Sequence, residues 1–177
     1  MRRDVTLALA AAAALLLPRP AKASPDIVVI MTDDLDSQML SDAVSRELMP
    51  NLKSRIIDQG TELSGYFVTD PLCAPSRATM LTGLYPHNHG VLGNRLPLGG
   101  ASKLDDSETL ATWLSTAGYR TALVGKYLNN YGDDVPQTYI PPGWTEWHAS
   151  IESLSEDTCW TRWPAGRACD PRPSGSR

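Results

Sequence analysis

Three short stretches of the chain have a residue pattern that predicts strands. Asp26–Met31 is a continuous apolar run rich in β-branched residues, which predicts a strand buried on both faces, and two further strands are predicted at Thr61–Val68, which Gly65 interrupts, and at Tyr119–Lys126. A strand buried on both faces belongs inside a sheet that helices cover on both sides.

Between these runs, apolar residues recur with helical spacing. One helix is predicted from Pro50 to Gly60 and another from Pro75 to Gly83, because proline suits the first turn of a helix and glycine its end. A third begins at a cap on Asp106 or Ser107 and ends at Gly118. The apolar faces of the first and third are Leu52, Ile56 and Ile57, and Leu110, Trp113, Leu114 and Ala117. This alternation predicts an α/β fold, a mostly parallel sheet flanked by helices.

The first 23 residues have the composition of a secretory signal peptide. Arg2 and Arg3 precede an apolar stretch from Val5 to Leu17, and Ala21-Lys22-Ala23 has the small residues of a cleavage site. The stretch is short for a bilayer span, so we expect an exported protein, secreted or periplasmic, without stable membrane insertion. An uncleaved anchor is the alternative.

The net charge limits the classes of partner. The whole chain carries −4, and residues 1–23 contribute four basic side chains and Asp4, which is +3, so the remainder carries about −7. This balance argues against nucleic acid as a ligand. If the substrate is anionic, its negative charge must be neutralised locally by Arg77, a lysine or a metal ion.

Cys73, Pro75 and Arg77 place candidate chemistry at the start of the second predicted helix. Unpaired N–H groups and the positive end of the helix dipole at Cys73 favour a thiolate, an oxyanion or a bound anion. Arg77 lies one turn further on, where its guanidinium can reach the same side.

Charged residues follow two of the predicted strands at one edge of the sheet. Asp33 and Asp34 come directly after the first strand, where hard carboxylate oxygens suit Ca²⁺ or Mg²⁺, although such a pair can also cap a loop. Lys126 ends the third strand at the same edge, where it can contact an anionic group of a ligand, or remain solvated.

The run Cys73-Ala74-Pro75-Ser76-Arg77, followed by Met80-Leu81-Thr82-Gly83, resembles the defining motif of sulfatases. The resemblance implies that Cys73 is oxidised to formylglycine by a formylglycine-generating enzyme. One hydroxyl of the aldehyde hydrate attacks the sulfur of a sulfate ester, and loss of the proton from the other expels sulfate and restores the aldehyde. Serine could perform only the first half.

The same resemblance implies roles for the charged residues. Asp33 and Asp34, with the modified Cys73, correspond to ligands of a divalent cation, usually calcium, and Lys126 corresponds to a lysine that binds the substrate sulfate. The run from Gly125 to Asn129 is most similar to N-acetylglucosamine-6-sulfatases, which implies a sulfated sugar as substrate. Leu128 stands where many arylsulfatases have histidine, and Asn129 is a candidate for a different polar role.

Two further groups have alternative interpretations. His87 and His89 lie in a Tyr-Pro-x-x-His-Gly run that sulfatases share, and we interpret them as part of a structural turn that supports the Cys73 helix rather than as metal ligands. Trp144 and Trp147 either line a sugar site or pack beneath a loop.

The resemblance covers Pro25–Ala149 and then fades. We therefore predict a partial alkaline-phosphatase-like fold over residues 24–150 and an irregular tail over residues 151–177, with a disulfide between Cys159 and Cys169 left open. Because the ligands and sulfate contacts of a sulfatase's later half are missing from these residues, we expect a truncated chain that exposes apolar sheet edges. The functional hypotheses are a sulfatase, an inactive remnant or binding protein, and a phosphohydrolase of the same superfamily, against which the intact Cys73 motif argues.

Overall fold

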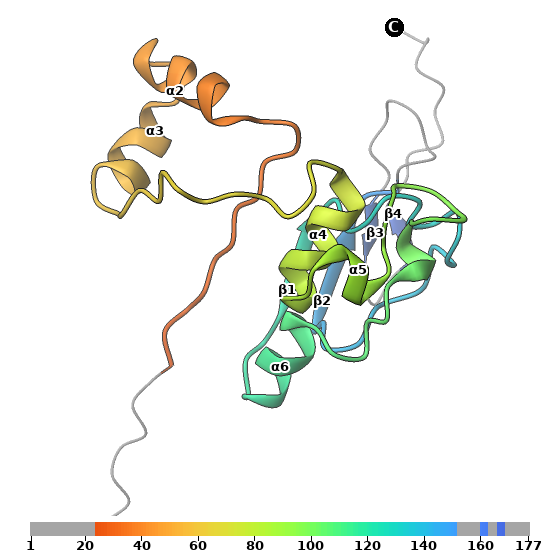
Figure 1. Cartoon of the computed structure of the whole chain (residues 1–177). Helices are drawn as coiled ribbons and strands as arrows, with labels where there is room; N and C mark the ends of the chain where they lie inside the picture. Colours follow the sequence, from red (N-terminus) through yellow and green to blue (C-terminus); the bar gives the residue numbers. More distant parts are fainter. Residues whose placement is uncertain (1–23, 152–159, 163–165, 169–177) are drawn as a thin grey trace, which may run out of the picture. The chain divides into compact units, whose positions relative to one another are not determined.

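A computed structural model describes residues 24–151, 160–162 and 166–168 of the chain (Figure 1). The predicted signal peptide and both tail cysteines lie outside the described residues. The chain divides into two compact units, Met1–Ser45 and Arg46–Arg177, which we describe separately. No helix in the described ranges has the length and apolar character needed to cross a membrane.

The described part of the first unit is an extended segment followed by helix α2, Ser37–Ser45. Asp36 begins this helix, because its Oδ1 accepts a hydrogen bond of 2.7 Å from the backbone amide of Met39. The prediction of a strand at Asp26–Met31 is wrong for this unit: the segment has no strand hydrogen bonds, and Val28 is 81% exposed. An apolar run becomes a strand only when a neighbouring strand pairs with it, and the described residues of this unit supply none.

The second unit begins with the predicted helix at Pro50, which is confirmed in an altered form. Helix α3, Pro50–Leu52, continues directly into a π-helical turn, η1, Lys53–Ile57. The predicted strand at Thr61–Val68 is wrong, since these residues form turns and open chain, and Phe67 is 85% exposed. This run therefore forms no strand, because a strand also needs a neighbouring strand with which to pair.

The predicted second helix is confirmed as α4, Cys73–Thr82. It ends at Gly83, whose φ of 69° is the left-handed conformation that glycine adopts without strain. The short helix α5, Pro86–His89, follows and packs against α4, and a 3₁₀ turn, η2, covers Ala101–Lys103.

The third predicted helix is confirmed as α6, Leu110–Thr116, but it begins at a different cap. Thr109 and Thr112 form a reciprocal capping box, whereas Ser107 is bonded to the carboxylate of Asp105 and does not start the helix. The predicted apolar face is also wrong in part. Trp113 is 45% exposed and donates its indole N–H to Glu108.

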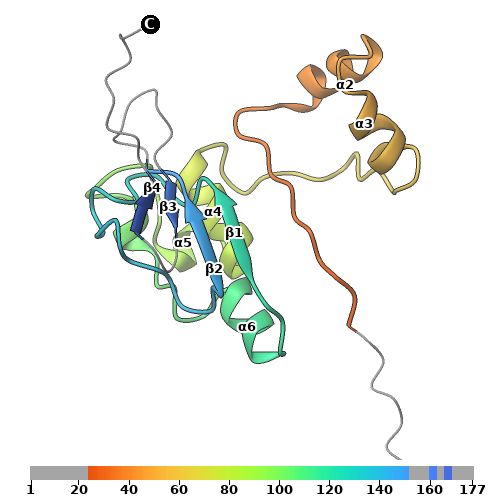
Figure 2. The same ribbon diagram turned by 180° about the vertical axis from the view of Figure 1, so that it is seen from behind.

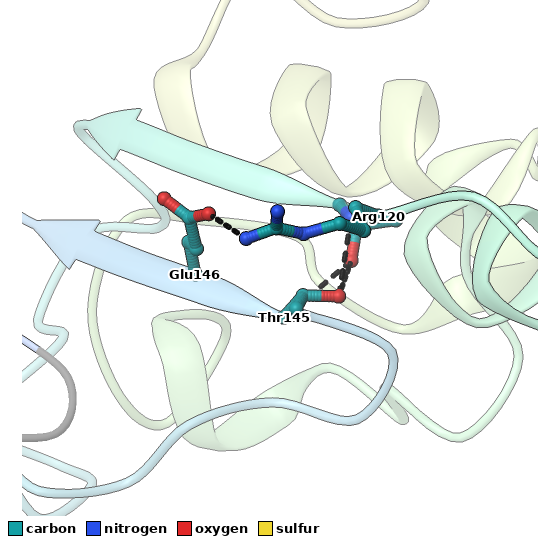
Figure 3. Close-up of polar contacts among 4 residues, drawn as sticks. Arg120, Thr145 and Glu146 are labelled. Carbon is teal, nitrogen blue, oxygen red and sulfur yellow. Dashed lines mark hydrogen bonds and ion pairs between the residues drawn. The ribbon is translucent and has the colours of Figure 1, made fainter.

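Strands β1, Ala122–Gly125, and β2, Glu146–Ala149, form the parallel pair that the α/β prediction requires, although β2 was not among the predicted strands. Figure 2 shows the two arrows side by side. Thr121 joins the strands just before they begin: its carbonyl accepts the amides of Thr145 and Glu146, and its own amide donates to the Thr145 hydroxyl. Arg120 adds an exposed ion pair of 2.6 Å to Glu146 (Figure 3).

The tail predicted to be irregular contains a described antiparallel pair. Strand β3, Trp160–Arg162, pairs with β4, Gly166–Ala168, and β3 lies next to β2 (Figure 2). The prediction is wrong for these residues because each strand is only three residues long, too short to give a recognisable period.

The core of the second unit lies between α4 and the strand β2. Trp147, from β2, is 1% exposed, and its ring meets Tyr127 and Tyr131 at centroid distances of 5.1 and 5.5 Å. Its indole N–H donates to the Tyr131 hydroxyl at 2.8 Å, so the one polar atom of the ring is satisfied. Trp144 packs against this cluster, and packing beneath a loop is the correct interpretation for Trp147.

Candidate active site

Cys73 is the first residue of α4, with a partly buried free thiol. The preceding residue, Leu72, is extended at φ −117° and ψ 142°, so the chain turns into the helix at Cys73 itself. Pro75 is the third residue of α4, and its missing N–H removes no helix hydrogen bond, because amides in the first turn have no partner within the helix. The prediction that Cys73 stands at a helix mouth is confirmed.

The backbone amides at this mouth are not all unpaired, which corrects the sequence-based expectation. The amide of Ala74 donates to Oδ1 of Asn94 at 2.9 Å, and the amide of Ser76 donates to the carbonyl of Leu72 at 3.0 Å. Asn94 therefore caps α4 from a separate loop, 20 residues along the chain. Sequence analysis missed this residue because a cap supplied from a distance leaves no local pattern.

Replacing Asn94 with alanine is expected to lower the free energy of unfolding by about 1 kcal/mol, the usual cost of losing a helix cap. The matched control is Asn88→Ala, which removes an exposed asparagine from α5. Urea unfolding of both variants measures the difference. Equal midpoints for the two variants would show that the Asn94 bond contributes nothing to α4.

Arg77 links α4 to the end of β1. Arg77 is 9% exposed, and its Nη1 donates to the carbonyl of Lys126 at 2.7 Å and to that of Tyr127 at 3.4 Å. Lys126 directly follows β1, so this contact fixes the backbone at the point where the lysine leaves the sheet. The structure thus brings two predicted site residues together, through the side chain of one and the backbone of the other.

The residues after Lys126 turn into the core. Leu128 is 1% exposed. Asn129 is 6% exposed, and its backbone carbonyl accepts the amide of Ala101 at 2.9 Å. Burial also raises the pKa of Tyr127, so this ring remains neutral. These residues support the strand end by packing.

Asp33 and Asp34 belong to the first unit, where both are exposed. Asp34 has a φ of 52°, a left-handed conformation that aspartate tolerates better than most residues. Two adjacent carboxylates offer hard oxygen donors, so their chemistry fits a calcium or magnesium ion. Their role as metal ligands stays a prediction.

The two histidines of the turn after α4 have different surroundings. His87 is exposed, and its ring stacks on Tyr85 at 5.8 Å. Both ring nitrogens of His89 have protein partners: Nδ1 accepts the amide of Val91 at 3.1 Å, and Nε2 lies 3.2 Å from the hydroxyl of Thr79. These bonds support the interpretation of a structural turn, because neither nitrogen of His89 is left for a metal ion.

Comparison with known proteins matches the sulfatase family model to residues 25–149, and the chain belongs to the sulfatase family. A Caenorhabditis elegans homologue of the extracellular sulfatase Sulf-1 is 42% identical over 130 residues, which is 72% of this chain and 17% of the relative. The human N-acetylglucosamine-6-sulfatase is 38% identical over 132 residues, which is 71% of this chain and 23% of that protein. Members of this family generally use a formylglycine and a divalent cation.

The chain spans less than a quarter of the length of these relatives. A solved structure concerned with the metabolism of glycosaminoglycans by Bacteroides thetaiotaomicron is similar at a TM-score of 0.45 and 23% identity, over 56% of this chain and 25% of that chain. The matched range confirms the predicted extent of the resemblance, Pro25–Ala149.

Proposed function

We propose that this chain carries the nucleophile part of a sulfuric ester hydrolase, with Cys73 as the precursor of formylglycine. The observation that carries the proposal is the complete motif from Cys73 to Gly83, folded as one helix whose Arg77 is bonded to the strand end at Lys126. A cysteine before a helix would not by itself support this assignment. The support comes from the buried side chain of Arg77, which connects the Cys73 helix to the second recurrent motif at Lys126.

In this proposal each residue has a separate task. The group at position 73 attacks the sulfur, and its second hydroxyl gives up a proton when sulfate leaves. Lys126 binds a sulfate oxygen and stabilises the charge that develops in the transition state. Arg77 fixes the backbone from which Lys126 projects, because a guanidinium with two carbonyl partners holds a defined geometry.

Asp33, Asp34 and the modified Cys73 would hold a divalent cation, which polarises the sulfate oxygens when bound. Calcium takes roughly six to eight oxygen ligands, so two carboxylates and one modified side chain leave much of the shell to water. We therefore expect weak calcium binding by this chain.

Removing both carboxylates, in the double variant Asp33→Asn and Asp34→Asn, is expected to lower calcium affinity by at least about tenfold, since charged ligands dominate the binding of hard cations. Isothermal titration of the full chain with calcium measures the effect. Asp26→Asn is the matched control, because this aspartate is also exposed and precedes the apolar run. A double variant that binds calcium as tightly as the unmodified chain would contradict the assignment.

The substrate class proposed is a sulfated sugar, as the name of the human N-acetylglucosamine-6-sulfatase suggests. The likeness to an extracellular sulfatase and the composition of residues 1–23 support an exported protein. A formylglycine-generating enzyme is the partner that the proposal requires.

Hydrolysis of a sulfate monoester by the full chain, produced together with a formylglycine-generating enzyme, tests the proposal. Faster turnover of the sulfate ester than of the matched phosphate ester supports a sulfatase, and the reverse order supports the phosphohydrolase alternative. Binding of a sulfated sugar without turnover supports a binding protein, the second candidate.

A further inference from the structure

A chain of hydrogen bonds joins three segments of the second unit around α4. Thr69 precedes the Cys73 helix, Thr79 lies in its middle, and His89 is the last residue of α5. The hydroxyl oxygens of Thr69 and Thr79 are 2.8 Å apart, and Nε2 of His89 is 3.2 Å from the hydroxyl oxygen of Thr79. Thr69 and Thr79 are not defining positions of the Cys73 motif, and His89 has so far been assigned only to the structural turn after α4.

The direction of donation along this series of hydrogen bonds follows from one backbone amide. The amide of Val91 can only donate, so Nδ1 of His89 accepts and carries no proton. In the neutral ring the proton is then on Nε2, which donates to the Thr79 hydroxyl. Because Thr79 accepts this bond, its own proton is available for the Thr69 hydroxyl.

The bond to Thr69 restrains the segment that leads into Cys73. Thr69, Pro71 and Leu72 are all exposed, with Leu72 at 42%, so apolar packing holds this segment only weakly. The Thr69–Thr79 bond ties the segment to the helix body four residues before Cys73, and Asn94 holds the helix at Ala74, one residue after it.

We infer that His89 is a positioning residue for Cys73, acting through Thr79 and Thr69 in its neutral form with the proton on Nε2. The meaning of this role for catalysis rests on the proposed function, whereas the hydrogen bonds themselves do not. His89 touches no reacting atom; it selects one hydroxyl orientation of Thr79 and thereby holds the entry to the helix.

The charges around His89 agree with a neutral ring. Burial lowers the pKa of His89 from its ordinary value of 6.5 and outweighs the backbone groups of Pro75 and of His89 itself and the charge of Asp70, which raise it. His87 lowers this pKa further. Because this pKa is depressed in the fold, the stability that the neutral ring contributes is present above about pH 6.5 and is lost as the pH falls through the lower pKa of the folded state.

The wild-type full chain provides the first test, by nitrogen-15 NMR of the imidazole rings at pH 7.5. We expect the signals of an unprotonated Nδ1 and a protonated Nε2 at His89, and a titration midpoint below 6.5, the ordinary value for histidine. A proton on Nδ1, or a His89 midpoint at or above 6.5, would overturn the inference.

Two substitutions of His89 by residues with an amide side chain distinguish the hydrogen bond of Nδ1 from that of Nε2. The side-chain amide of glutamine can place a donor near the position of Nε2, whereas that of asparagine reaches only the position of Nδ1. We expect His89→Asn to raise the hydrogen-exchange rates of the Ala74 and Ser76 amides about tenfold, the effect of one lost hydrogen bond, and His89→Gln to restore them to within about twofold. His87→Gln is the control.

Equal exchange rates in His89→Asn and His89→Gln would contradict the positioning role. Thr79→Val supplies a second route, because it removes the hydroxyl between His89 and Thr69 and should reproduce His89→Asn. Its control is Thr116→Val in α6, whose hydroxyl bonds only to the carbonyl of Thr112. None of these measurements needs turnover, so a chain that hydrolyses no sulfate ester can still pass or fail them.

Discussion

Replacing Cys73 with alanine is expected to abolish hydrolysis of a sulfate ester, with a loss of at least about a thousandfold, because the variant has no group that can attack sulfur. Replacing it with serine should allow at most one turnover per molecule, since a single hydroxyl can take up the sulfuryl group but has no second hydroxyl with which to release it. A progress curve at high enzyme concentration distinguishes these outcomes.

The loss must come from chemistry and not from unfolding. Cys73 is partly buried at the start of α4, and alanine is a good helix former, so the thermal midpoint of Cys73→Ala should stay close to that of the unmodified chain. Ser115→Ala, on the exposed surface of α6, serves as the activity control. Turnover by Cys73→Ala at the rate of this control would contradict the proposed role of Cys73.

Replacing Arg77 with methionine is expected to lower the free energy of unfolding by about 3 kcal/mol. Methionine keeps most of the packing of the side-chain stem but removes the charged donor that bonds to the carbonyls of Lys126 and Tyr127. Buried acceptors that lose a charged donor carry a large desolvation cost. Urea unfolding, followed by circular dichroism, measures the change.

Arg120→Met is the matched control for this prediction. Arg120 also bonds to a residue of a neighbouring segment, Glu146, but its side chain is 80% exposed, and exposed ion pairs contribute little. We expect this control to change stability by less than about 0.5 kcal/mol. If the two variants are equally stable, Arg77 does not hold the end of β1 in the way described here.

The elements that the sequence predicts best are those with strong local signals at both ends. Helix α4 has Pro75 in its first turn and Gly83 directly after its last residue, and it forms within two residues of the predicted start. Strand β1 lies within the predicted run Tyr119–Lys126, and it is paired with β2 in parallel, as the alternating pattern requires. In both cases the local preference and the packing agree.

The predictions that fail are those that depend on a distant partner. The runs at Asp26–Met31 and Thr61–Val68 have strand composition, but a strand also needs hydrogen bonds to a neighbour, which composition cannot supply. The start of α6 was misplaced for a local reason: Ser107 bonds to Asp105, which leaves the cap to Thr109.

The supporting residues of the candidate site were hidden for the same reason. Cys73, Arg77 and Lys126 stand out because they belong to recurrent motifs, whereas Asn94 reaches Ala74 across 20 residues. The turn that contains His89 was predicted to support the Cys73 helix, but its partner Thr79, 10 residues away, was not. Hydrogen bonds between such distant positions follow no period, so only a structure can pair them. The candidate catalytic residues could therefore be named from the sequence, but the hydrogen-bond partners that support them could not.

The exposed apolar side chains lead us to expect that the isolated chain aggregates. Within the described residues, Ile30 is 73% exposed and Val124, on β1, is 74% exposed, so the isolated chain should aggregate more readily than a globular domain of its length. A soluble monomer with a cooperative melting transition would contradict this expectation.

Mass spectrometry of the Cys73 peptide tests the central claim most directly. The full chain is produced together with a formylglycine-generating enzyme, and Cys73 is compared before and after treatment with a hydrazide that captures aldehydes. We expect an aldehyde at position 73 that reacts with the hydrazide. A free thiol at that position, in a cell that converts a known sulfatase to completion, would contradict the account.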